Sequence, residues 1–209
     1  LGDSTCQTNL EDTYPQTGWG QIFHEFLNDK CEVINLAKNG RSTKSFIEEG
    51  LHEPFKNNVK ENDIVFIQFG HNDEKEDVER HTEPFTTYQK NLLYLIDIAR
   101  KNGAIPVLLS SIYRRHFDED GKLIEGTHGK YPLAMSQLAE KEKILFIDMT
   151  SITHDWLSSI GDVGSKMYFM NFGPNIYDNY LEGKTDNTHL RYAGAHKICE
   201  LLVAQIKQT

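Results

Sequence analysis

The chain has 209 residues, of which 38% are hydrophobic and 25% are charged, a balance typical of a globular protein. Its 31 acidic residues outnumber its 22 basic ones, and the net charge of −9 argues against nucleic acid as a partner, because phosphate binding needs a basic surface. No run of 18 or more apolar residues occurs, so we expect no membrane span.

Short apolar runs alternate with helical stretches along the chain. Four runs predict strands, at residues 32–37, 64–69, 104–109 and 144–148. Apolar side chains spaced by three and four predict one helix over residues 88–99, ending near Asn102-Gly103, and a second from Ala195 to Ile206. We expect loops at 113–131 and 161–185. Strand–helix alternation predicts a three-layer α/β/α sandwich with a parallel sheet, in one domain spanning residues 1–209.

The three cysteines, Cys6, Cys31 and Cys199, are odd in number and widely spaced, which fits neither a disulfide framework nor a zinc site. We expect reduced or buried thiols, and neither a cofactor nor a metal. The chain begins at Leu1 with a motif already under way, and no leader is visible. We interpret this start as a trimmed N-terminus. It favours a secreted or periplasmic protein over a cytoplasmic one.

Four short polar blocks contain the reactive residue types. They are Gly2-Asp3-Ser4-Thr5, Asn39-Gly40-Arg41-Ser42, Gly70-His71-Asn72-Asp73 and Asp186-Asn187-Thr188-His189. The second and third blocks directly follow predicted strands, and ligands gather at the carboxyl ends of parallel strands. Together the blocks offer a nucleophile, a backbone donor, an amide donor, and a base with an acid to orient it. Acyl transfer through serine needs this inventory.

The order of these blocks resembles that of the SGNH (GDSL) hydrolase superfamily, from Gly2 to Ala195. Neighbouring residues narrow the resemblance to the rhamnogalacturonan acetylesterase group, carbohydrate esterase family twelve. They lie in the stretches 14–21, 35–42, 68–73, 114–117 and 186–190. The resemblance implies a flavodoxin-like parallel sheet, in which the apolar strand before the serine block is central. Here only Leu1 stands in the place of that strand. We therefore expect upstream residues that form this strand to be missing.

The resemblance and the chemistry together imply a role for each block. Ser4 would be the nucleophile, His189 the general base and Asp186 the acid that orients it. The oxyanion hole would comprise the backbone N–H groups of Ser4 and Gly40 and the side-chain amide of Asn72.

Four further residues are candidates for substrate binding. Arg114 and Arg115 could bind a galacturonate carboxylate, since a guanidinium suits bidentate recognition of that group. A structural ion pair is the alternative for both. His71 could face the substrate or make a structural hydrogen bond, and Arg41 could support its loop.

These observations predict a serine esterase that removes O-acetyl groups from plant cell-wall polysaccharide, with rhamnogalacturonan or its oligosaccharides as the partner. An acetyl-xylan esterase or another carbohydrate or small-ester esterase is the alternative within the same class. Outside that class, His71, Asp73, Asp186 and His189 could form a metal-dependent hydrolase, or the chain could be an inactive carbohydrate-binding domain. The sequence does not determine the oligomeric state.

Overall fold

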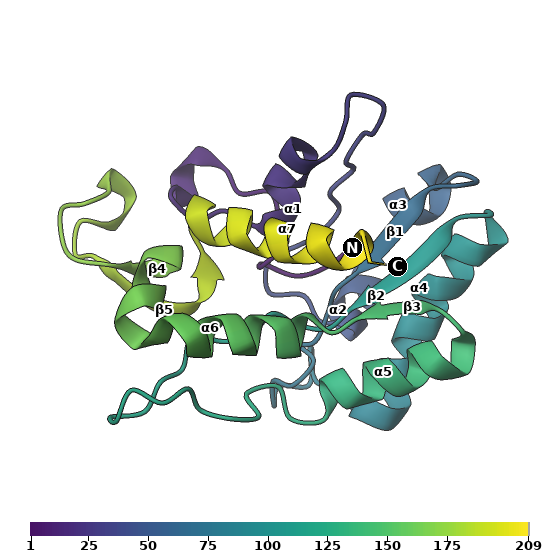
Figure 1. Ribbon diagram of the computed structural model, residues 1–209. Helices are drawn as coiled ribbons and strands as arrows, with labels where there is room; N and C mark the ends of the chain where they lie inside the picture. Colours follow the sequence, from purple (N-terminus) through teal and green to yellow (C-terminus); the bar gives the residue numbers. More distant parts are fainter. Residues whose placement is uncertain (209) are drawn as a thin grey trace. The chain divides into compact units, whose positions relative to one another are not determined.

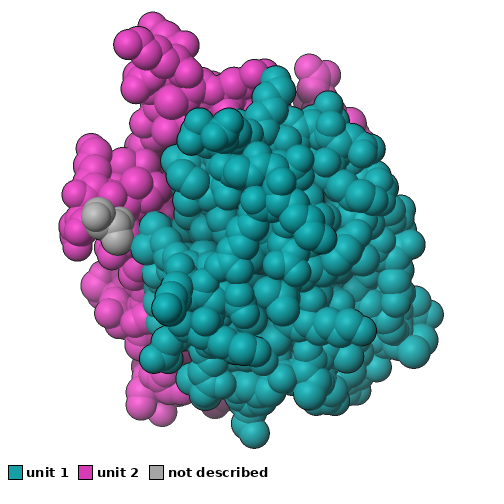
Figure 2. Space-filling view, turned by 90° about the vertical axis from the view of Figure 1, so that its right-hand side faces the viewer, with its two compact units in different colours: residues 1–3, 38–111, 128–149 teal, residues 4–37, 112–127, 150–209 magenta. Residues whose placement is uncertain are grey.

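A computed structural model describes residues 1–208 of the chain. These residues form two compact units, each assembled from separated stretches of the chain and coloured separately in Figure 2. The first unit comprises Leu1–Asp3, Lys38–Ser111 and His128–Met149. The second comprises Ser4–Ala37, Ile112–Thr127 and the residues from Thr150 onward.

The first unit is built on a parallel sheet of three strands, which lie side by side in Figure 1 in the order β1 (Ile64–Ile67), β2 (Ile105–Leu109) and β3 (Leu145–Ile147). Ile64 pairs with Ile105, and Val107 pairs with Leu145. The parallel sheet and the α/β class predicted from the sequence are confirmed. Three of the four predicted strands are present.

The fourth predicted strand, at residues 32–37, is wrong. Within residues 1–208 this stretch belongs to no ladder, and Ile34 is 66% exposed. Residues Leu1–Asp3 lie beside β1 instead: Gly2 forms a parallel bridge with Gln68, and the N-terminal amine of Leu1 donates to the Phe66 carbonyl at 2.7 Å. Asn35 uses its side chain locally, donating to the Cys6 carbonyl at 2.8 Å. The apolar run therefore lacks the paired backbone that a strand requires.

The helices of the first unit are α2 (Thr43–Glu48), α3 (Glu53–Asn58), the π-helical turn η3 (Pro84–Tyr88), α4 (Gln89–Lys101) and α5 (Tyr131–Glu142). Helix α4 packs against β2, and α5 packs against β3. The residues predicted to form the inner face of α4 are buried: Leu92, Leu95, Ile96 and Ala99. The helix ends where predicted, because Gly103 adopts the left-handed conformation (φ 72°) that terminates helices.

The second unit has the antiparallel pair β4 (Phe169–Phe172) and β5 (Lys184–Leu190). Its helices are η1 (Glu11–Thr13), α1 (Trp19–Ile22), η2 (Phe23–Phe26), α6 (Met149–Ser165), η4 (Lys166–Tyr168), η5 (Asp178–Tyr180) and α7 (Tyr192–Ile206). The loop expected at 161–185 is therefore partly wrong, since this stretch contains the end of α6 and all of β4. Helix α6 is kinked at Gly161, the residue at which the expected loop begins.

The C-terminal helix α7 is present as predicted and packs against α1. Gly194 lets the start of α7 lie against η4, because a Cβ atom there would lie 2.1 Å from the Tyr168 carbonyl oxygen. Over residues 1–208, no helix has both the length and the apolar character needed to cross a membrane.

Candidate active site

The block Asp186-Asn187-Thr188-His189 forms a bulge in β5. Phe169 pairs with Leu190, and Asn171 pairs with Thr185, so one residue of β4 stands opposite four residues of β5. A bulge of this kind re-aims the side chains that it carries. Asp186 closes the bulge locally, because its Oδ1 atom accepts from the backbone N–H groups of Thr188 (2.9 Å) and His189 (3.0 Å).

Within the second unit, three residues from the two ends of the chain form a hydrogen-bonded series. The distance from Ser4 Oγ to His189 Nε2 is 2.9 Å, and the distance from His189 Nδ1 to Asp186 Oδ2 is 2.7 Å. Ser4 is buried, and Thr5 anchors its segment by accepting from the Trp19 backbone N–H at 2.9 Å. In this arrangement the carboxylate fixes the imidazole, and the imidazole faces the hydroxyl. This is the arrangement that activates serine for attack.

The electrostatics of Asp186 suit a group that stays ionised beside histidine. Burial by itself would raise the pKa of this carboxyl. The His189 ring and the backbone N–H groups of His189 and Thr188 outweigh burial, and the pKa falls to about 2. At neutral pH the carboxylate is therefore charged, and it accepts a hydrogen bond from the Nδ1–H group of His189.

Asn187, inside the bulge, is held by Arg115 and Asn171. The Arg115 backbone N–H donates to the Asn187 carbonyl (2.8 Å), and its guanidinium donates to Asn187 Oδ1 (2.7 Å). Asn171 donates to the same Oδ1 at 3.1 Å. The guanidinium also forms an ion pair with Asp162 and lies over the Phe117 ring, 5.6 Å from its centroid. Burial lowers the pKa of Arg115, while Asp162 opposes that effect.

Arg115 is only 3% exposed, and its guanidinium donates to Asn187 and Asp162 within the protein. This geometry favours the structural ion pair over the galacturonate contact that the sequence suggested for this residue. Arg114 is half-buried and donates to the Thr127 carbonyl at 2.8 Å. Its contact ties together the two ends of the 114–127 loop.

The block around Gly40 lies in the first unit, just before α2. Gly40 adopts the left-handed conformation (φ 72°), which a side chain would strain. The Arg41 guanidinium pairs with Glu49 at 2.7 Å and donates to the Asn39 carbonyl at 3.0 Å, so it supports its own loop. Ser42 caps α2 through a reciprocal pair of hydrogen bonds with Ser45.

The Asn72 side chain is 7% exposed and has both ends engaged within the first unit. Its Nδ2 atom donates to the Arg41 carbonyl at 3.2 Å, and its Oδ1 atom accepts from Arg80 at 3.3 Å. Arg80 in turn forms an ion pair with Asp77, with a shortest distance of 2.6 Å. One N–H bond of the Nδ2 group thus points at the Arg41 carbonyl. The same group has a second N–H bond, which this contact does not use.

The two neighbours of Asn72 are buried. The His71 ring lies edge-on to His128, with 4.6 Å between the ring centroids. The Asp73 carboxylate accepts from the Thr43 backbone N–H at 3.1 Å and from the Thr82 hydroxyl at 3.0 Å. These contacts join the third block to the start of α2. In the described part of the chain, no three His, Cys, Asp or Glu side chains form a group able to hold a metal ion.

The chain belongs to the GDSL-like lipase/acylhydrolase family, whose sequence pattern it matches over residues 1–195. The family resemblance inferred from the four blocks is therefore confirmed. So is the assignment to enzymes that hydrolyse carboxylic esters.

Among individual proteins, the chain is 40% identical to the rhamnogalacturonan acetylesterase RhgT of Bacillus subtilis, over 99% of this chain and 88% of the relative. It is 36% identical to the probable rhamnogalacturonan acetylesterase YesY of the same species, over 99% and 90% of the two chains. A solved structure, YxiM of Bacillus subtilis, superposes with a TM-score of 0.80 at 24% identity. That match covers 99% of this chain and 55% of YxiM, and it supports the SGNH hydrolase fold.

Sequence reasoning missed the residues that hold the blocks in place. They are Arg80 and Asp77 beside Asn72, Thr43 and Thr82 around Asp73, and Asn171, Asp162 and Asn187 around the bulge. Only Asn187 lay inside a recognised block. The others are polar residues in segments without a motif, and their partners lie up to 47 positions away in sequence.

Proposed function

We propose that the chain is a serine esterase that removes O-acetyl groups from plant cell-wall polysaccharide, with acetylated rhamnogalacturonan or its oligosaccharides as substrate. The observation that carries this proposal is the hydrogen-bonded series from Ser4 through His189 to Asp186. The substrate class is supported by the names of the two Bacillus subtilis relatives at 40% and 36% identity.

In the proposed reaction, Ser4 Oγ attacks the acetyl carbonyl carbon while His189 Nε2 takes the hydroxyl proton. The tetrahedral intermediate collapses, and His189 returns the proton to the departing sugar oxygen. The acetyl group then remains on Ser4. Water, deprotonated by the same His189, attacks the carbonyl carbon of this acetyl-enzyme. The bond to Ser4 Oγ then breaks, His189 returns the proton to Oγ, and acetate leaves. Asp186 holds the imidazole in the required tautomer and stabilises the positive charge that it acquires in each step.

The developing oxyanion would be stabilised by the backbone N–H groups of Ser4 and Gly40 and by the Asn72 amide. Two local features support this assignment. Gly40 has no side chain and adopts the left-handed conformation, so substrate could approach its backbone closely. The anchored amide of Asn72 carries a second N–H bond beyond the one directed at Arg41. Donors fixed before the reaction stabilise charge at no reorganisation cost.

Replacing the proposed nucleophile tests the mechanism. Ser4→Ala should lower acetate release from acetylated rhamnogalacturonan by about 10⁶-fold while the circular dichroism spectrum stays native, as loss of a triad nucleophile does. A chelator should leave the wild-type rate unchanged. Normal turnover by a folded Ser4→Ala variant, or a chelator-sensitive rate restored by zinc, would overturn the serine mechanism in favour of metal-assisted hydrolysis.

A substrate panel tests the substrate class separately. Acetate release should have a higher kcat/KM on acetylated rhamnogalacturonan than on acetylated xylan or on a long-chain lipid ester. A preference for xylan would assign the enzyme to the acetyl-xylan alternative. A preference for the lipid ester would exclude the carbohydrate assignment.

A further inference from the structure

The loop 173–183, between β4 and β5, lies next in sequence to the strand that carries Asp186 and His189. It is anchored to the segment around η1. Asn179 Nδ2 donates to the carbonyls of Glu11 (2.6 Å) and Tyr14 (3.0 Å), and the Tyr180 hydroxyl donates to the Thr13 carbonyl at 3.4 Å. These three contacts give the loop a defined shape although no regular strand or long helix runs through it.

Four aromatic rings of this region form a continuous chain of edge-to-face contacts. The ring centroids of Tyr14 and Tyr177 are 5.7 Å apart, those of Tyr177 and Phe172 are 4.7 Å apart, and those of Phe172 and Tyr180 are 5.7 Å apart. Two apolar side chains of this region are exposed: Tyr14 by 61% and Leu181 by 63%. Exposed apolar groups that lie together can form a contact site for another molecule.

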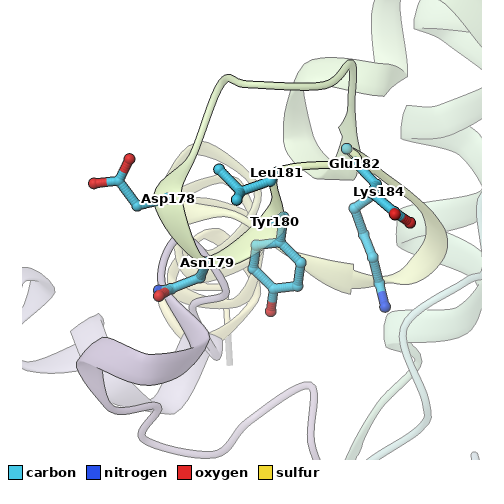
Figure 3. Close-up of a pocket in the computed structure, with 7 residues that line it drawn as sticks. Asp178, Asn179, Tyr180, Leu181, Glu182 and Lys184 are labelled. Carbon is cyan, nitrogen blue, oxygen red and sulfur yellow. The ribbon is translucent and has the colours of Figure 1, made fainter.

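An open pocket of about 440 Å³ is lined by residues 178–184 of the same region. Figure 3 shows the side chains that line it, with the Tyr180 ring between Asn179 and Lys184 and with Asp178 on the side away from Lys184. The Lys184 ammonium lies over the Tyr180 ring, 5.8 Å from its centroid. The lining therefore combines an aromatic ring, an aliphatic side chain and charged groups.

The Lys184 end of this pocket lies close to Asp186 along β5, within the second unit. Lys184 is two residues from Asp186 on β5, and it pairs with Phe172 of β4. Burial raises the pKa of the Tyr180 hydroxyl, and the nearby charge of Asp186 raises it further. The Tyr180 hydroxyl is thus within electrostatic reach of the carboxylate that orients His189.

We infer that the pocket formed by the loop 178–184 is a subsite for a neutral sugar residue of the substrate, next to the residue that carries the acetyl group. This inference rests on the proposed function. The C–H face of a pyranose would pack against Tyr180 and Leu181, which provide ring and aliphatic surface. Its hydroxyl groups would donate to the carboxylates of Asp178 and Glu182.

The charged groups that line the pocket indicate whether it would bind a neutral or an acidic sugar. The pocket has two carboxylates and one ammonium group, in a chain whose net charge is −9, so it repels a uronate. Carboxylates accept hydrogen bonds from sugar hydroxyls without such a penalty. Rhamnogalacturonan contains a neutral sugar, rhamnose, and an acidic one, galacturonate. The subsite would therefore select the rhamnose residue.

The test compares a substrate that reaches the subsite with one that does not. Leu181→Asp adds a charge at the exposed edge of the pocket. It should lower the ratio of kcat/KM on acetylated rhamnogalacturonan oligosaccharides to kcat/KM on 4-nitrophenyl acetate by about tenfold. The matched control is Leu133→Asp, a leucine of α5 that is 54% exposed, and it should leave the ratio unchanged. An unchanged ratio for Leu181→Asp would overturn the subsite.

Inhibition by deacetylated oligosaccharide tests which sugar is bound. Glu182→Ala should raise the oligosaccharide's inhibition constant against 4-nitrophenyl acetate hydrolysis, because the variant loses an acceptor for a sugar hydroxyl. A lower inhibition constant for Glu182→Ala than for wild type would instead show that a uronate occupies the pocket, since removing a carboxylate relieves the repulsion. Failure of the proposed function is distinguishable, since wild-type enzyme would then release no acetate from the oligosaccharides.

Discussion

At the scale of single residues, the orientation of the Asn72 amide depends on a charged neighbour. Arg80 donates to Oδ1 of Asn72 and is itself held by the Asp77 carboxylate. An amide rotated by 180° would direct an N–H group at the guanidinium and a carbonyl oxygen at the Arg41 carbonyl. Arg80 therefore favours the orientation in which Nδ2 is available as a donor. This makes it a positioning residue for the proposed oxyanion hole.

A double-mutant cycle measures this coupling. Asn72→Ala should lower kcat by about 10²–10³-fold with little change in KM, as loss of an oxyanion donor does. Arg80→Ala should lower kcat by about tenfold, the equivalent of one hydrogen bond of ~1.4 kcal/mol. In the Asn72→Ala background, Arg80→Ala should have almost no further effect. Additive losses in steady-state kinetics would show that Arg80 acts independently of Asn72.

At the scale of elements, the bulge of β5 determines where Asp186 and His189 point. The hydrogen bonds from Asp186 to the backbone close the bulge from within, and Arg115 fixes it from outside through Asn187. Arg115 lies in the 112–127 segment, and Asp162 lies beside the kink of α6. Arg115, itself held by Asp162, thus supports a four-residue bulge from a separate segment of the second unit.

Arg115→Met should therefore impair catalysis on every ester. The substitution keeps the unbranched stem but removes the donors to Asn187 and Asp162, so the bulge loses its outer support. We expect kcat to fall by about tenfold or more on both acetylated rhamnogalacturonan and 4-nitrophenyl acetate. The free energy of unfolding should fall by about 2–3 kcal/mol. Arg114→Met is the matched control and should retain the rate on 4-nitrophenyl acetate. A loss of activity that is confined to the polysaccharide and becomes smaller at high salt would show that Arg115 contacts the substrate.

The sequence predicted the elements whose signals are local, and it missed those that depend on distant partners. The strands β1, β2 and β3 and the helices α4 and α7 follow from apolar runs and helical spacing. The run at 32–37 has the same local signal as a strand, but without a paired backbone it remains irregular. The strand β4 went unseen because its Phe169–Phe172 run is short and pairs with a bulged strand. Arg115 shows the same limit, since its buried role depends on Asp162 and Asn187, 47 and 72 positions away.

At the scale of the whole molecule, the buried carboxyl group of Asp73 links stability to pH. The side chain is fully buried, and burial raises its pKa to about 7, against the hydrogen bonds from Thr43 and Thr82, which lower it. The charge of Asp3 raises it further. In the unfolded chain the ordinary pKa is 3.8. Between these two values the folded protein keeps a proton that the unfolded chain has lost.

Stability should consequently fall as pH rises through this window. One extra proton in the folded state lowers the free energy of unfolding by up to about 1.4 kcal/mol per pH unit, between about pH 4 and pH 7. Asp73→Asn lacks this titration but keeps an oxygen that accepts from Thr43. The difference in unfolding free energy, variant minus wild type, should rise with pH across the window and level off on both sides. Urea titrations at several pH values measure it. A difference that stays flat or falls between pH 4 and pH 7 would mean that Asp73 is ionised in the folded protein throughout, stabilised by its hydrogen bonds.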